Sequence, residues 1–268
     1  KMLGRTDHRV ETARSWALAG NKDSAFYQLD RSVKGNYAEY FRLSTDTAFC
    51  NLHDDDRWVK IIKMVKLNEY RNDSLANAQY PNINHRLVTI LDTIFNNDQQ
   101  LRLEEPFIEK QYGWNTPQRK ELTRKINKLD SINQLKVSSI LQQYGWPGKE
   151  LVGEKGNLTI FLVIQHSSIE FQKRYLPEAN KALASGKLRP SSYALLTDRM
   201  ALAEGRLQTY GTQLFRNPVT GKYFVQPLVD PANVDQRRSK VSLGPMKDYV
   251  SQWGINWSIE EYEKGLEK

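Results

Sequence analysis

The chain is poor in the residues that build disulfide frameworks and metal sites. Its 268 residues include one cysteine, Cys50, and four histidines at positions 8, 53, 85 and 166. A single cysteine excludes an internal disulfide and any site with several cysteine ligands. The histidines are scattered and form no H-E-x-x-H pattern, so the sequence carries no zinc signature. We therefore expect neither a bound metal nor another cofactor.

Long apolar runs are also missing. The longest, "LTIFLVI" (158–164), is far shorter than the ~20 residues that a membrane helix needs, so we expect a buried element and no membrane span. The chain begins Lys1-Met2, so its first residue is not an initiator, and a leader can have been removed. A periplasmic and a cytoplasmic location both remain open.

Motifs for phosphate, acyl or nucleic-acid chemistry are absent too. There is no glycine-rich Walker or Rossmann loop and no G-x-S-x-G elbow. The net charge is +8, and its densest basic stretch is "RKELTRKINK" (119–128). We interpret this stretch as a solvated helix face, because no zinc finger, RNP motif or basic zipper accompanies it. Nucleic acid is not an expected partner, and the charge is weak support for an anionic ligand.

Apolar spacing at the front of the chain predicts helical hairpins. Ala13, Trp16 and Ala17 recur at helical spacing, Gly20 and Asn21 interrupt the pattern, and a second helix then follows. The arrangement resembles a tetratricopeptide repeat, which needs a neighbour to bury its apolar face. We predict a first domain over residues 1–83, with polar residues 68–85 as a linker or surface loop. A protein partner is expected to bind through residues 10–67.

The rest of the chain, residues 84–268, predicts a second, helical domain. An echo, "QYGWN" (111–115) and "QYGWP" (143–147), falls where two helices are expected to end at glycine. Asn217-Pro218 and Thr220-Gly221 separate two β-rich runs, which predicts a small β-hairpin near 212–226. A terminal amphipathic helix is expected to carry Trp253, Trp257 and Tyr262. The predicted fold class is mainly α, with helical hairpins packed on a helical domain.

Seven stretches together resemble one family of bacterial proteins, which is known only as domain of unknown function 6624. They are "DQQLR" (98–102), "YGWPGKELVG" (144–153), "FLVIQHSS" (161–168), "FQKRYLP" (171–177), "LLTDRM" (195–200), "GRLQTYGTQ" (205–213) and "VDQRR" (234–238). Their order and spacing match over residues 86–250. The resemblance implies no activity, but it implies that these polar stretches are the best candidates for a site.

The candidate site residues come from these stretches and have two competing interpretations. His166 is the candidate acid or base, oriented by Asp198 or Asp98, with Tyr210 beside them. The residues expected to bind a ligand are Gln99, Arg102, Gln165, Arg199, Gln208, Gln213, Arg237 and Arg238. Guanidinium groups grip carboxylate or phosphate, which predicts a pocket for an anionic small molecule, with acid–base hydrolysis or transfer as its chemistry. The same residues also suit ordinary core hydrogen bonds and salt bridges. In that case the protein is a non-enzymatic interaction module that uses its helical repeats.

Overall fold

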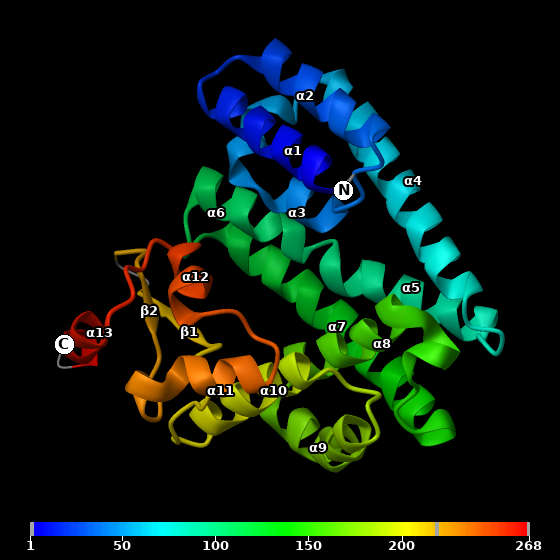
Figure 1. Cartoon of the computed structure of the whole chain (residues 1–268), viewed down its shortest axis with the longest axis vertical. Coiled ribbons are helices and arrows are strands. Elements are labelled where there is room, and N and C mark those ends of the chain that lie inside the picture. Colours follow the sequence, from blue (N-terminus) through cyan, green and yellow to red (C-terminus); the bar gives the residue numbers. More distant parts are fainter. Residues whose placement is uncertain (1–2, 218–219, 267–268) are drawn as a thin grey trace. The chain divides into compact units, whose positions relative to one another are not determined.

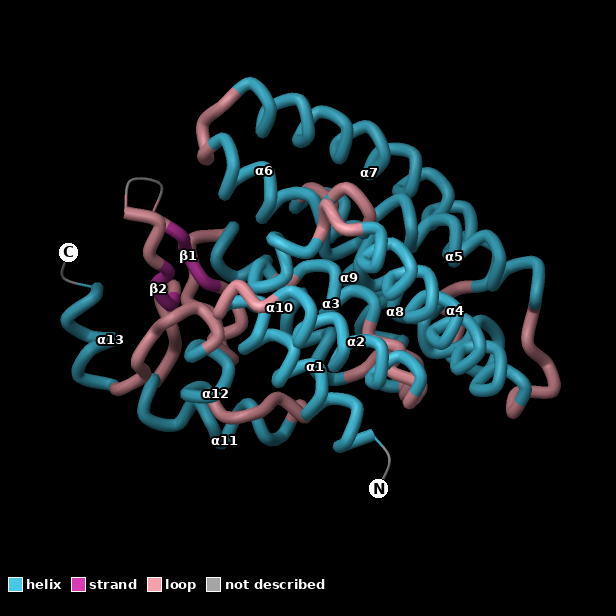
Figure 2. The backbone as a smooth tube through the Cα atoms, turned by 90° about the horizontal axis from the view of Figure 1, so that it is seen from above, coloured by secondary structure: helices cyan, strands magenta, loops and turns pink. Residues whose placement is uncertain are grey.

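The computed structural model describes residues 3–217 and 220–266, and it confirms the predicted mainly α fold with one small β-hairpin (Figure 1, Figure 2). The chain divides into two compact units, Lys1–Leu129 and Asp130–Lys268. The expected division at residues 83 and 84 remains a prediction. Within the described residues, no helix combines the length and the apolar character that crossing a membrane requires.

The first unit is built from helices. They are α1 (Leu3–Leu18), α2 (Lys22–Lys34), α3 (Tyr40–Thr45), α4 (Asp56–Ala78), α5 (His85–Gln99) and α6 (Glu105–Tyr112), with 3-10 turns at Thr47–Leu52 and Arg102–Glu104. Helix α7 (Pro117–Tyr144) begins in this unit and ends in the second. Ala13 and Ala17 of α1 are fully buried with Ala25 and Leu29 of α2. The small side chains of the three alanines let these two helices pack closely.

Helix α4 overturns the predicted linker at residues 68–85, because it continues to Ala78. Asn68, which reads as a loop residue, is buried. Its side-chain amide nitrogen donates to the carbonyl of Val33 (2.8 Å) in the last turn of α2 and to that of Tyr37 (3.0 Å) beyond it. These acceptors lie more than thirty residues away in sequence. A contact so distant in the chain stabilises a helix that local polarity argues against.

The second unit contains the remaining elements. They are α8 (Lys149–His166), α9 (Ile169–Ala184), α10 (Pro190–Ala203), β1 (Leu214–Arg216), β2 (Tyr223–Val225), a 3-10 turn (Pro231–Asn233), α11 (Val234–Lys240), α12 (Met246–Ser251) and α13 (Ile259–Leu266). Helices α8, α9 and α10 pack on one another. No position of α10 from Ser191 to Met200 is exposed, so neighbouring segments cover this helix on all sides.

Local signals place the ends of α6 and α7 correctly. Gly113 and Gly145 follow α6 and α7 with φ of 91° and 64°, so both copies of the echo end a helix at a left-handed glycine, as predicted. Helix α9 begins at a serine cap, where two adjacent serines have different roles. Ser168 caps α9 by accepting from the Phe171 amide, whereas the Ser167 hydroxyl donates back to the Val163 carbonyl of α8.

The hairpin and the C-terminal segments form the last part of the second unit. Strands β1 and β2 are antiparallel, with Phe215 opposite Phe224. Leu228, Met246 and Tyr262 belong to the small core beside them. The prediction of one terminal helix is wrong for Trp253 and Trp257. Both lie in the connection between α12 and α13.

Candidate functional site

Asp198 is the centre of a buried hydrogen-bond network in the second unit. This residue of α10 is 1% exposed, and its carboxylate faces the loop 208–213. Oδ1 accepts from the backbone amides of Thr209 (2.7 Å) and Tyr210 (3.0 Å). Oδ2 accepts from the Thr212 amide (3.0 Å) and the Thr212 hydroxyl (2.9 Å). A carboxylate is the one protein side chain that accepts from so many donors, so Asp198 fixes the loop by its N–H groups.

Side chains of α11 and α12 bind the carbonyl groups of the same loop. Arg237 Nε donates to the Thr209 carbonyl (2.8 Å), and Arg238 Nη1 donates to the Tyr210 carbonyl (2.8 Å). The Tyr249 hydroxyl donates to the Thr212 carbonyl (2.7 Å). Side chains from three helices therefore bind the backbone of three loop residues, Thr209, Tyr210 and Thr212. A loop held in this way is preorganised.

Arg238 is buried, and its guanidinium contacts groups of the protein instead of solvent. Its guanidinium lies 4.9 Å from the centre of the Tyr249 ring and also donates to the Gly244 carbonyl (2.6 Å). Burial lowers the pKa of Arg238, because the charged form loses its hydration. Burial also raises the pKa of the Tyr249 phenol. The Arg238 guanidinium, which the sequence analysis assigns to an anionic ligand, therefore donates to carbonyl groups of the protein itself.

Gln208 joins the loop to the strand side of the unit. It is fully buried, and its Nε2 donates to the carbonyls of Gln213 (3.0 Å) and Gln226 (2.9 Å). Its Oε1 accepts from the Gln213 amide (2.9 Å). The backbone of Gln208 also pairs with Leu228 in an isolated parallel bridge. This one glutamine therefore fixes the chain immediately before β1 and immediately after β2.

The network extends to the end of α8 through Arg199. Its Nη1 donates to the Gln165 carbonyl (2.5 Å), and its Nε donates to Gln213 Oε1 (3.3 Å). Gln172 Nε2 donates to the same Gln165 carbonyl (3.2 Å). The Oε1 atoms of Gln165 and Gln172 are buried and accept no hydrogen bond from the described residues. An unpaired buried acceptor costs about 1–3 kcal/mol, so this end of the network is under-satisfied.

The structure thus brings many of the predicted site residues together. Gln165, Asp198, Arg199, Gln208, Gln213, Arg237 and Arg238 are joined through the loop that carries Tyr210. His166 ends α8 and is half-buried. None of the hydrogen bonds described for Asp198 comes from His166. The Tyr210 side chain is half-buried near Tyr193, whose hydroxyl donates to Asn180 Oδ1 (2.6 Å).

Gln99 and Arg102 belong to the first unit and form a local cluster around Asp98. Asp98 is 1% exposed, and its Oδ2 accepts from Gln99 Nε2 (2.5 Å). Arg102 Nη1 donates to the Asp98 carbonyl (2.6 Å) and lies 3.4 Å from Oδ1. As the spacing predicts, Asp98 and Arg102 interact across one helical turn. Among the described residues, no group of three or more metal-ligating His, Cys, Asp or Glu side chains gathers in either unit.

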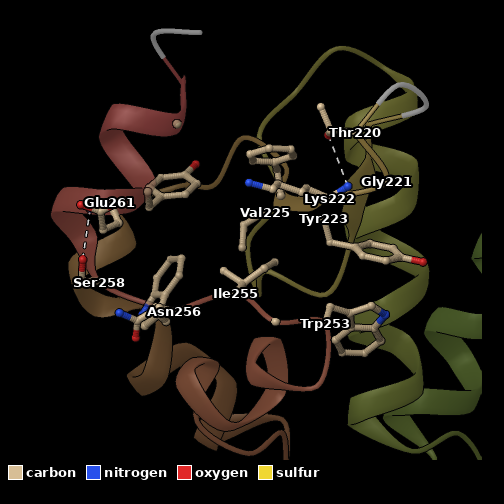
Figure 3. A pocket seen from close by; sticks show the side chains of 15 residues that line it. Thr220, Gly221, Lys222, Tyr223, Val225, Trp253, Ile255, Asn256, Ser258 and Glu261 are labelled. Atoms are coloured by element: carbon tan, nitrogen blue, oxygen red, sulfur yellow. Dashed lines mark hydrogen bonds between the residues drawn. The ribbon is translucent and has the colours of Figure 1, made fainter. Parts of the chain in front are cut away.

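A pocket of about 590 Å³ opens between β2 and the start of α13 (Figure 3). Tyr223 and Trp253 lie on one side of it, and Asn256, Ser258 and Glu261 lie on the other, with Val225 and Ile255 between them (Figure 3). The complete lining is Thr220, Gly221, Lys222, Tyr223, Phe224, Val225, Trp253, Gly254, Ile255, Asn256, Trp257, Ser258, Glu261, Tyr262 and Gly265. Four of these side chains are Trp or Tyr, so large amphipathic rings dominate the wall.

Ring contacts fix the two sides of this pocket and connect one of them to the network. Tyr223 and Trp253 have ring centres 6.4 Å apart, and Trp253 makes an edge contact with Tyr249 at 4.9 Å. Tyr249 is the residue whose hydroxyl binds Thr212 in the loop. On the other side, Trp257 packs on Tyr262 at 5.5 Å. The Tyr262 hydroxyl accepts from the Leu228 amide (2.6 Å), which ties α13 to the segment after β2.

A comparison with known families bears on these features. A family model described as "Family of unknown function (DUF6624)" matches residues 81–258, about two thirds of the chain. The chain belongs to this family. The match confirms the resemblance predicted from residues 86–250. No curated protein and no solved structure matches the chain.

The DUF6624 match includes the Asp198 network and most of the pocket lining, whereas Glu261, Tyr262 and Gly265 follow it. Sequence reasoning missed the pocket because it placed Trp253 and Trp257 on one amphipathic helix. A signal was available: Gly254 lies between them with φ of 71°, a backbone conformation that favours glycine. A glycine between two aromatic residues in a polar segment indicates a connection between helices.

Proposed function

We propose that the DUF6624 domain of this chain is a small-molecule-binding domain, and that its ligand occupies the aromatic pocket between β2 and α13. The observation that carries the proposal is the pocket itself, with a volume of about 590 Å³ and a lining of tryptophan and tyrosine. Ligand sites typically have volumes of about 300–1,000 Å³, apolar or aromatic walls and a few polar groups. This pocket has all three properties.

The Asp198 network supports the proposal by giving the pocket a rigid frame. Gln208 holds the chain at the base of the hairpin, and Tyr249 connects Thr212 to Trp253 at the pocket wall. A binding site keeps its affinity when its side chains are already positioned before the ligand arrives. We therefore assign Asp198, Gln208 and Arg238 a positioning role.

The acid–base chemistry predicted for His166, Asp198 and Tyr210 remains a prediction, and so does an anionic ligand. The described hydrogen bonds of Asp198 come from the loop, and those of Arg238 go to carbonyl and sulfur acceptors. Groups engaged in this way are poorly placed to orient an imidazole or to grip an anion. Binding without catalysis accounts for these contacts with fewer rearrangements.

The proposal is tested with 5-fluorotryptophan, since the chain contains six tryptophans. Fluorine spectra are recorded while small ring compounds of neutral, cationic and anionic character are added, with signals assigned from Trp→Phe variants. We expect binding compounds to shift the signals of Trp253 and Trp257 and to leave that of Trp16 in place. Ile255→Trp should fill the pocket and abolish the shifts. Shifts confined to other tryptophans, or none with any compound, contradict the proposal.

A second candidate function is protein interaction through the first unit, in which the tetratricopeptide-like character of the hairpins would supply the binding surface. The observation in its favour is a set of exposed apolar side chains on α4. Val59 (64% exposed), Leu67 (46%) and Tyr70 (70%) are separated by eight and three residues, so they share one face. Tyr70→Glu should release a protein that co-purifies with the wild-type chain. Equal recovery of that protein with both chains contradicts this candidate.

A further inference from the structure

The aromatic pocket has two ring-lined sides with apolar residues between them, which suits a flat ligand that offers two apolar faces. Tyr223 and Trp253 form one side, and Val225 and Ile255 lie between the two sides (Figure 3). Trp257 and Tyr262 form the other side. Trp253 and Trp257 are only half-buried, so each ring keeps surface available for contact. Burial of that surface by a ring-shaped molecule is favourable.

The charges of the lining indicate a neutral ligand. Lys222 and Glu261 are the two charged residues of the lining, so its formal charge sums to zero. Both residues are exposed, and Glu261 also lies 3.5 Å from Lys264 outside the pocket. An anion requires an excess of positive groups, and an ammonium ion held in an aromatic cage gains from an excess of negative ones. Neither excess is present.

Polar groups of the lining fit hydroxyl groups. Thr220, Asn256 and Ser258 belong to the lining, and each combines donor and acceptor capacity in one side chain. The Ser258 hydroxyl accepts from the Glu261 amide (3.1 Å) and keeps its own hydrogen for donation. Asn256 is exposed beside Trp257. A ligand that carries hydroxyls along its edge can bind these groups while its ring lies against the aromatic sides.

We propose that the pocket binds a neutral carbohydrate. The C–H faces of a pyranose ring would pack on Trp253 and Trp257, and its hydroxyl groups would bind Asn256, Ser258 and Lys222. This inference rests on the proposed function and specifies its ligand class. Sugars combine an apolar face with a polar edge in one small ring, and the lining offers both kinds of partner within one pocket.

The experiment is a titration of the full chain with cellobiose, N,N′-diacetylchitobiose and methyl β-glucopyranoside, followed by calorimetry and tryptophan fluorescence. We expect at least one of these sugars to bind. Trp253→Ala should weaken its affinity about tenfold, since stacking on an aromatic ring contributes that much or more. Asn256→Ala, at an exposed position, should weaken it about threefold through a lost hydrogen bond and serves if Trp253→Ala fails to fold. Trp114→Ala, in the first unit and exposed, is the matched control and should leave the affinity unchanged.

Tetramethylammonium, benzoate and inorganic phosphate are the comparison probes. If ring fragments shift the fluorine signals of Trp253 and Trp257 but none of the sugars binds, the carbohydrate inference is wrong and the proposed function stands. If tetramethylammonium binds in place of the sugars, the pocket is a cation cage and the inference is likewise wrong. If no compound of any kind reaches these two tryptophans, both proposals fail.

Discussion

Replacing Asp198 with asparagine tests whether the loop 208–213 depends on a carboxylate. The carboxylate accepts hydrogen bonds from four donors, three of which are backbone amides. Asparagine keeps the size of the side chain but exchanges one oxygen for an NH₂ group. That group has only donors and would face the backbone amides of the loop. About two hydrogen bonds to a charged acceptor are lost.

The expected cost follows from these contacts. A hydrogen bond to a charged group contributes about 1.5–3 kcal/mol, so Asp198→Asn should lower the free energy of unfolding by about 3–6 kcal/mol. Buried Arg238 adds to the cost, because its charge lies close enough to Asp198 to interact with it. The control is Asp248→Asn, at an exposed position of α12, which should change the stability by less than about 0.5 kcal/mol.

Urea denaturation is the assay, followed by circular dichroism and by tryptophan fluorescence, since the two units can unfold separately. Amide hydrogen exchange then locates the change. Exchange should accelerate at Thr209, Tyr210 and Thr212 and stay constant in α1 and α2. A loss of less than about 1 kcal/mol, with unchanged exchange in the loop, would refute the role that we assign to Asp198.

Two further predictions concern a half-buried histidine and a helix end. Burial lowers the pKa of His53 below 6.5 beside Trp58, so only the unfolded state binds its proton readily. The free energy of unfolding of the first unit should therefore fall as the pH drops below about 6.5. In a pH series of urea melts, His53→Phe should show a smaller fall than the wild-type chain. The control His8→Phe, at an exposed position, should show the same fall as the wild-type chain. Gly145→Ala should lower the free energy of unfolding by about 1–2 kcal/mol, because Gly145 has a φ of 64° that alanine adopts only with strain. Gly244 has no positive φ, so Gly244→Ala is the control and should not have this cost. Equal melting temperatures for the two variants would contradict this reasoning.

Local sequence signals succeed where a single turn of chain decides the conformation. Gly113 and Gly145 each end a helix because only glycine adopts the left-handed backbone there at little cost. The β-hairpin follows from two β-rich runs on either side of a turn. The same signals fail where a distant group intervenes. Asn68 has a low intrinsic helix propensity, yet the carbonyls of Val33 in α2 and of Tyr37 beyond it stabilise this residue inside α4.

The candidate site divides in the same way. The polar stretches that resemble the family identify Gln165, Asp198, Arg199 and Arg238 as candidate residues of one site. Hydrogen bonds do connect these residues through the loop 208–213. Their partners cannot be deduced from the sequence. Most of those partners are backbone groups of the loop 208–213, and the direction of a backbone amide depends on how the whole chain folds. Residue types alone favoured an anion site, which remains a prediction, and they did not show the internal hydrogen bonds that the structure has at these residues.

The aromatic pocket depends more on the tertiary structure than the helix ends or the hairpin do. The sequence by itself determined the helical class, the hairpin, the family and the supply of aromatic residues near the C-terminus. Only the tertiary structure decided that Tyr223 meets Trp253 and that Tyr262 reaches Leu228. These pairs are thirty or more residues apart, and nothing in a local pattern encodes such a distance. Helix ends depend on neighbouring residues, whereas a cavity depends on which distant surfaces meet.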